Sequence, residues 1–325
     1  MTMHADNKSD VRNPELSIVI PVYNSAAIFP ELYRRLSENL SDIVSGFEII
    51  AVLDGCVDDS YSVIHDVHIR DSRVKLIELS RNFGHQTAVT AGLEYAAGEM
   101  VVIMDDDLED PPEVLPAMIA RLKEGFDVVY GIRKRRKRSI MHRIGYSLFY
   151  RILSRLADVS IPNDAGDFCV MRRRVVDALN SMPEKNRFLR GLRAWSGYRQ
   201  AGFEYERGGR YAGKSGYGLR KYLALAFTGI ASFSYRPLTF ISLAGAMIAS
   251  ASFFLGSAFI ILKVAGLIFD VPGWTSLAVL ILFLSGIQIM TTGIIGAYIA
   301  RIYEEVKQRP KYLVNRLEGF EQEER

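Results

Sequence analysis

The feature that most limits how this chain can fold is an apolar run that ends in three adjacent carboxylates. Met100 to Met104 are all apolar, which is typical of a strand buried in a parallel sheet, and Asp105, Asp106 and Asp107 follow directly. Because three carboxylates cannot be buried without a counter-charge, we expect the strand to end there and the acids to meet a cation. Alternate residues of an extended segment point the same way, so Asp105 and Asp107 can share a site that Asp106 does not. Oxygen ligands suit Mg²⁺ or Mn²⁺, although an acidic loop that only caps the next helix also fits.

Strand and helix patterns alternate four times over the first 110 residues or so. We predict strands at 16–24, 47–53, 74–79 and 100–104, and helices at 28–40, 60–68, 87–97 and 113–123. This alternation favours a doubly wound α/β domain, in which ligands bind at the carboxyl ends of the strands. Tyr23, Asp54, Arg81 and Asp105 stand at those ends. We therefore expect them to converge on one crevice.

Two long uncharged runs near the C-terminus, 237–262 and 271–300, predict membrane helices. A helix rises 1.5 Å per residue, so the first run can extend about 39 Å, more than the roughly 30 Å of a hydrocarbon core. Buried helices of soluble proteins normally keep a polar face, which neither run has. We predict transmembrane helices at 237–262 and 273–300, joined by a short outward loop at 263–272. Lysine and arginine flank both ends, so the positive-inside rule places the α/β domain in the cytoplasm.

A basic run, Arg133 to Arg138, is followed by an amphipathic basic pattern at 140–156. The run can be a mobile solvated loop, or it can contact phosphate or lipid. The amphipathic segment can pack on the domain or lie in a membrane interface. No nucleic-acid motif accompanies these charges, so we expect no nucleic-acid partner. Cys56 and Cys169 fit no disulfide or zinc pattern, which indicates a reducing compartment.

Several motifs, in this order and spacing, resemble the GT-A nucleotide-sugar glycosyltransferases. They are Ile20-Pro21-Val22-Tyr23-Asn24, Asp54-Gly55, Arg81-Asn82-Phe83-Gly84 and the run from Asp105 to Pro112. Within that group the chain is most similar to the polyprenyl-phosphate glycosyltransferases, which include dolichyl-phosphate mannose synthases and bactoprenol glucosyltransferases. Gly166-Asp167-Phe168, Arg187-Phe188-Leu189-Arg190-Gly191, Tyr211-Ala212-Gly213-Lys214-Ser215 and the ending Tyr303-Glu304-Glu305-Val306-Lys307 look like the bacterial subgroup. The resemblance covers nearly the whole chain from Leu16.

The resemblance implies roles for individual residues. The nucleotide-sugar would be held by Pro21, Tyr23, Asp54, Arg81 and Asp106. Asp105 and Asp107 would be catalytic as ligands of Mg²⁺ or Mn²⁺, with Glu109 as a third metal ligand. Asp167 would be catalytic by orienting the acceptor or by assisting the loss of its last proton, although it could instead cap a helix at 172–179.

The sequence also departs from the family pattern. Ser25 replaces a usual Glu, Leu53 an acid and Cys56 a Ser. Cys169 stands where many members carry an Arg that meets the lipid phosphate. Arg172, Arg210 and Lys214 are the candidates to replace that cation.

We accordingly expect inverting transfer of glucose from UDP-glucose to undecaprenyl phosphate, a membrane lipid. The rival interpretations are a processive polysaccharide synthase, whose signature only the run Arg190 to Trp195 approaches, and a non-catalytic membrane scaffold. The expected organisation is a disordered segment 1–14, a cytoplasmic GT-A domain 15–219, a juxtamembrane segment 220–236, the two spans, and a cytoplasmic tail 301–325. By resemblance, the protein would be a homo-oligomer, such as a tetramer, in the bacterial inner membrane.

Overall fold

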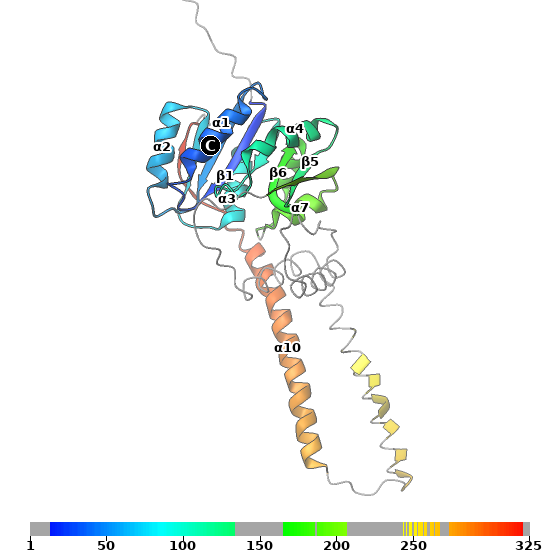
Figure 1. Ribbon diagram of the computed structural model, residues 1–325. Coiled ribbons are helices and arrows are strands. Elements are labelled where there is room, and N and C mark those ends of the chain that lie inside the picture. Colours follow the sequence, from blue (N-terminus) through cyan, green and yellow to red (C-terminus); the bar gives the residue numbers. More distant parts are fainter. Residues whose placement is uncertain are drawn as a thin grey trace, which may run out of the picture. The chain divides into compact units, whose positions relative to one another are not determined.

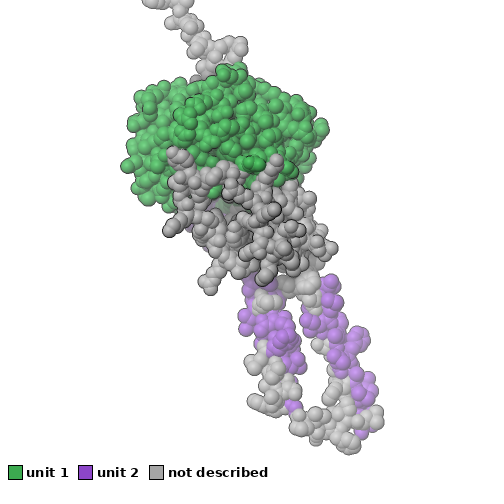
Figure 2. Space-filling view, in the orientation of Figure 1, with its two compact units in different colours: residues 1–147, 159–217, 310–325 green, residues 148–158, 218–309 purple. Residues whose placement is uncertain are grey.

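The computed structural model describes residues 14–133, 165–185, 187–206 and 273–320, and some residues between 243 and 266 (Figure 1). They belong to two compact units (Figure 2). The first unit comprises residues 1–147, 159–217 and 310–325, and the second comprises 148–158 and 218–309.

Eight strands of the described residues form one mixed sheet in the order β7-β5-β6-β4-β1-β2-β3-β8. Their bounds are β1 Leu16–Val22, β2 Phe47–Leu53, β3 Val74–Leu79, β4 Met100–Ile103, β5 Val128–Arg133, β6 Ala165–Arg172, β7 Gln200–Tyr205 and β8 Val314–Glu318. The four central strands β4, β1, β2 and β3 are parallel. β6 runs antiparallel to β4 and β5, β7 runs parallel to β5, and β8 runs antiparallel to β3. The α/β prediction is confirmed for the parallel centre, and the antiparallel strands make the sheet mixed.

Helices cover both faces of this sheet. One layer contains α1 Phe29–Leu40, α2 Ser60–Arg70, the short η1 Pro112–Val114 and α4 Leu115–Lys123. The other contains α3 His85–Tyr95, α6 Arg173–Ser181 and α7 Leu189–Trp195. Successive residues of a strand face opposite sides, so Ile18 packs in the core under α1 while Val19 faces α3.

α3 lies close to the sheet at Gly92 because its buried face is built from small residues. A Cβ on Gly92 would come within 2.3 Å of Val19 Cγ1 and 3.1 Å of Val52 Cγ2. Ala88 and Ala91 are completely buried on the same helix. This close packing fixes the position of the first turn of α3, which begins at His85 just beyond the carboxyl end of β3.

The C-terminal residues contain the last strand of the sheet. Within the predicted cytoplasmic tail 301–325, β8 pairs with β3, with Leu317 opposite Ile77. The Glu318 carboxylate accepts a hydrogen bond from the Tyr61 hydroxyl at 2.7 Å and contacts His65 Nδ1 at 2.6 Å. β8 therefore completes the edge of the sheet and belongs to the α/β unit, so that unit extends beyond the predicted 15–219.

In the second unit the main described element is α10, Trp274–Val306. Its segment Phe283–Val306 is the one helix of the described residues that is long and apolar enough to cross a membrane. The Thr291 and Thr292 hydroxyls donate to the carbonyls of Ile287 and Gln288, at 2.8 and 2.9 Å. The helix continues beyond residue 300, where the second span was predicted to end. Half of the residues of the first predicted span, 237–262, lie outside the described residues, and those that are described are helical.

Candidate active site

The acidic loop begins where β4 leaves the sheet. Met104 is still fully buried and its N–H donates to the Val19 carbonyl at 3.1 Å. The Asp107 carboxylate then accepts the Glu109 N–H at 3.0 Å, a local bond typical of tight turns. Leu108 lies between them with φ of 58°, a left-handed value that is uncommon for a leucine. The chain therefore turns sharply directly after the three acids.

Asp105 and Asp106 point to different sides, as the alternation predicts. Asp105 Oδ1 lies 2.7 Å from His85 Nε2, whereas Asp106 Oδ2 accepts the Tyr23 N–H at 3.4 Å. The pKa of Asp106 is raised to about 6, mainly by burial and further by the charges of Asp105 and Asp107. Hydrogen bonds from Ser25 and Tyr23 act in the opposite direction. Burial also acts to raise the pKa of Asp105, but the hydrogen bond and charge of His85 lower it overall.

The ends of β2 and β3 are joined through Asp54. This carboxylate is only 3% exposed and accepts two backbone N–H groups, from Phe83 at 2.6 Å and from Gly84 at 2.8 Å. Gly55 has φ of 64°, and a Cβ there would come within 2.3 Å of Asn82 N. The two loops therefore touch backbone to backbone, and Asp54 holds the Arg81 loop in place. The Arg81 guanidinium carbon lies 4.3 Å over the Phe83 ring.

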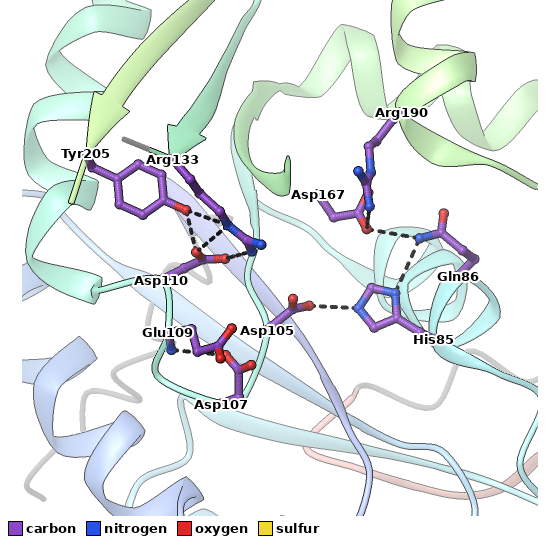
Figure 3. A network of polar contacts seen from close by, with 10 residues as sticks. All are labelled: His85, Gln86, Asp105, Asp107, Glu109, Asp110, Arg133, Asp167, Arg190 and Tyr205. Carbon is purple, nitrogen blue, oxygen red and sulfur yellow. Dashed lines mark hydrogen bonds and ion pairs between the residues drawn. The ribbon is translucent and has the colours of Figure 1, made fainter. Parts of the chain in front are cut away.

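A polar network crosses from the acidic loop to the antiparallel half of the sheet (Figure 3). The Asp167 carboxylate in β6 receives Arg190 Nε at 2.7 Å and Nη2 at 3.1 Å, and Gln86 Nε2 at 3.2 Å. Gln86 Nε2 also lies 3.3 Å from His85 Nδ1, and His85 in turn contacts Asp105. Partial burial opposes a charge on His85, but the hydrogen bond and charge of Asp105 raise its pKa.

A second network lies beside the first (Figure 3). Asp110, 1% exposed, receives Arg133 Nε at 3.2 Å and Nη2 at 2.9 Å, and it also accepts the Tyr205 hydroxyl. Burial raises the pKa of Asp110, although the charge of Arg133 opposes that change. The network ties the end of the acidic loop to the ends of β5 and β7.

The predicted metal ligands stand on one loop. Asp105 and Asp107 lie at the carboxyl edge of the sheet, and the third predicted ligand, Glu109, is 7% exposed. Within the described residues, no group of three or more His, Cys, Asp or Glu side chains is placed to hold a metal ion by itself. Mg²⁺ usually takes one or two carboxylates and completes its shell with water and substrate phosphates, so a Mg²⁺ site does not require three protein carboxylates.

Two predictions about the acceptor side need correction. Asp167 lies within β6, and α6 begins only at Arg173, so Asp167 does not cap that helix. Arg172 is five residues further along β6, about 17 Å away in an extended strand. Its guanidinium donates to the carbonyls of Phe126 and Leu122 at 2.9 and 3.1 Å. Arg172 is therefore withdrawn as a ligand of the acceptor phosphate, and Arg210 and Lys214 lie outside the described residues.

Cys169 is fully buried, with Ile103 of β4 and Tyr130 of β5 as its strand partners. Burial raises the pKa of its thiol, against a smaller effect of Arg193. Arg193 of α7 is itself 4% exposed, and its guanidinium carbon lies 5.3 Å over the Tyr130 ring. A guanidinium thus lies near this region although position 169 carries none.

The sequence motifs assign no role in the site to the residues that connect these carboxylates. They are His85, Gln86, Arg190, Arg133 and Tyr205, together with Asp110. His85 and Gln86 follow the Arg81 motif directly, and Arg190 lies in a motif of the bacterial subgroup. Their position beside or within these motifs is the sequence signal that could have pointed to them. Arg133 was considered only as the first residue of the basic run, and Tyr205 carried no such signal.

The comparisons with known proteins define the class of this protein. The Glycosyl transferase family 2 model matches residues 17–179, so the chain belongs to glycosyl transferase family 2. The mixed α/β sheet is the GT-A type that the motifs predicted, and the resemblance to polyprenyl-phosphate glycosyltransferases is confirmed.

Its relatives match over nearly their full length. The uncharacterized glycosyltransferase YkcC of Bacillus subtilis (strain 168) is 42% identical, over 95% of this chain and 96% of that protein. The SfII prophage-derived bactoprenol glucosyl transferase of Shigella flexneri is 37% identical, over 93% of this chain and 98% of that protein. Among solved structures, a mannosyltransferase from Pyrobaculum calidifontis in complex with GDP-Man and Mn²⁺ has a TM-score of 0.46 and 18% identity, covering 92% of this chain and 89% of that chain.

Proposed function

We propose that the protein transfers glucose from UDP-glucose to a polyprenyl phosphate, undecaprenyl phosphate, with inversion at the sugar carbon. The observation that carries this proposal is the match, over 93% of the chain, to proteins named bactoprenol glucosyl transferase. The site is compatible with it, because carboxylates that could bind a metal follow β4 and the exposed Arg81 follows β3, and both strands belong to the parallel centre of the sheet.

On the donor side, we assign the nucleotide-sugar to Pro21, Tyr23, Asp54, Arg81 and Asp106. Tyr23 is 53% exposed and Arg81 is exposed, so both side chains are accessible to a ligand. Asp105 and Asp107, with Glu109, would hold Mg²⁺ or Mn²⁺. When bound, such an ion supplies charge stabilisation for the departing nucleoside diphosphate.

On the acceptor side, little general-base help is needed. A phosphate monoester with a second pKa near 6 is mostly dianionic at neutral pH, so it is already a nucleophile. Both oxygens of Asp167 are engaged by Arg190, and one also receives Gln86. We therefore assign Asp167 to orienting the acceptor side of the site and not to removing a proton.

For the acceptor phosphate itself we retain Arg210 and Lys214. Pairing a phosphate with a cation is a charge-assisted contact worth roughly 1.5–3 kcal/mol, so Arg210→Ala or Lys214→Ala should raise the acceptor KM about ten- to a hundredfold. The donor KM should stay nearly constant. If these side chains only bind bulk lipid headgroups, the variants would weaken membrane association in a salt-dependent way and leave turnover of a short, water-soluble acceptor unchanged.

We also propose that the protein spans the bacterial inner membrane twice, with the α/β unit in the cytoplasm. α10 supports one of the two spans. Phe283, Ile289 and Ile302 on this helix are 65%, 73% and 61% exposed, so they need an apolar environment that this chain does not provide among its described residues.

The direct test uses purified full-length protein in lipid nanodiscs with undecaprenyl phosphate and a panel of labelled UDP- and GDP-sugars. We expect a single glucose to appear on the lipid, with UDP-glucose as the preferred donor. Products with many sugars would indicate a processive synthase instead. No glycolipid with any donor would contradict the proposal and favour the non-catalytic scaffold.

A further inference from the structure

The Gln86 side chain joins the donor and acceptor halves of the candidate site. Its Oε1 accepts the Leu189 N–H, the first residue of α7, at 3.0 Å. Its Nε2 lies 3.2 Å from Asp167 Oδ2 and 3.3 Å from His85 Nδ1 (Figure 3). One amide in the first turn of α3 thus contacts β6, α7 and the histidine that holds Asp105.

The orientation of this amide is decided by its partners. The Leu189 N–H can only donate, so it requires the amide oxygen, and the Asp167 carboxylate paired with Arg190 can only accept, so it requires the amide nitrogen. Turning the amide over would lose both bonds at once. Two independent partners, the Leu189 N–H and the Asp167 carboxylate, therefore select the same orientation of the Gln86 amide.

The same orientation places the Gln86 amide nitrogen beside His85, 3.3 Å from Nδ1. On the other side of the ring, the Asp105 carboxylate can only accept, so His85 Nε2 donates to Asp105 Oδ1 at 2.7 Å. The amide of Gln86 therefore directs the imidazole at Asp105 on one side and restrains Asp167 on the other.

We propose that Gln86 is a positioning residue that holds Asp105, through His85, and Asp167 in fixed relative orientations for glycosyl transfer. This inference rests on the proposed function, in which Asp105 serves the donor and Asp167 the acceptor. The gain is preorganisation, since a small displacement of a reacting pair lowers the rate of the chemical step more than it weakens binding. The competing explanation is that Gln86 only joins α3 to α7 through the Leu189 N–H.

Gln86→Glu separates the two explanations. The new side chain is nearly isosteric and still offers an oxygen to the Leu189 N–H, so the joint between α3 and α7 survives. It replaces the N–H₂ group with an oxygen, so the hydrogen bond donated to Asp167 is lost and two carboxylates face each other. We expect kcat to fall about ten- to a hundredfold, as for the loss of one or two hydrogen bonds to charged partners, with the donor KM within about threefold of wild type.

Two further variants complete the design. Thr90→Ala is the matched control, because the Thr90 hydroxyl donates to the Gln86 carbonyl at 2.8 Å on the same helix and contacts no side chain of the network. It should leave kcat unchanged even if it lowers the melting temperature. Gln86→Glu is also combined with Asp167→Asn, and the effect of Gln86→Glu on kcat should shrink to less than about threefold in that background if it acts through Asp167.

The outcomes are distinct. Wild-type kcat in Gln86→Glu, or an effect that multiplies fully with that of Asp167→Asn, would overturn the positioning role and leave the proposed function intact. A wild-type protein that transfers no sugar to lipid would instead overturn the proposed function and this inference with it. The inference is supported if Gln86→Glu lowers kcat while its melting temperature stays normal. Its effect on kcat must also fail to multiply with the effect of Asp167→Asn.

Discussion

Replacing Asp54 by Asn tests whether this residue serves the fold, the ligand, or both. In the structure its carboxylate accepts two short bonds from the Phe83 and Gly84 N–H groups and is 3% exposed. Asn has one acceptor oxygen, so one of the two N–H groups would face an N–H₂ group. Water cannot replace the missing partner at a site this buried.

The magnitude follows from those two bonds. Asp54→Asn loses one hydrogen bond to a charged acceptor and leaves one buried N–H donor without a partner. Together these two effects should lower the free energy of unfolding by about 2–4 kcal/mol. For a unit of roughly 200 residues this corresponds to a melting temperature lower by about 5–15 °C. The Arg81 loop should loosen at the same time, so we expect the donor KM to rise as well.

The assay is thermal unfolding of the full-length protein in detergent, with UDP binding measured by calorimetry on the same samples. Asp59→Asn is the control, because Asp59 is exposed and its side chain makes no cap bond at the start of α2. It should change neither quantity. An unchanged melting temperature in Asp54→Asn would refute the reasoning, and weaker UDP binding without loss of stability would show that Asp54 serves the nucleotide alone.

Other predictions concern the acidic loop, the pH dependence of stability and the topology. Asp105→Ala or Asp107→Ala should abolish transfer without unfolding the protein, and near wild-type activity of either variant in excess Mg²⁺ or Mn²⁺ would contradict the metal assignment. The hydrogen bonds of Arg73 lower the pKa of Asp71 to about 2, so this carboxylate stabilises the fold above its unfolded pKa near 3.9 and loses that contribution as the pH falls through 2. Asp71→Asn should therefore cost about 2 kcal/mol of unfolding free energy at pH 7 and much less near pH 2, and an equal cost at both values would exclude the ion pair as its cause. Reporter tags at both termini should be cytoplasmic and one near Gly266 should lie on the far side of the membrane, whereas a cytoplasmic tag near Gly266 would mean that the runs do not span.

The parallel half of the fold could be predicted because its evidence is local. β1 and β2 are buried at every residue, which produces the continuous apolar runs seen in the sequence. β2 and β3 have the predicted bounds, and α3 begins two residues earlier than expected. The polar residues after these strands also reach the predicted edge of the sheet, because parallel strands all end on the same side.

What only the tertiary structure decided is how distant segments meet. β8 carries an exposed and half-buried pattern with no strong apolar signal, and it pairs with β3 across more than 200 residues of chain. Gln86 meets Asp167 and Leu189 for the same reason, since 81 and 103 residues separate them in sequence. Periodicity reports whether a residue is buried within its own element, and it contains no information about which other element supplies the partner. The strand ends could therefore be placed from the sequence, whereas the hydrogen bonds that orient their carboxylates required the folded chain.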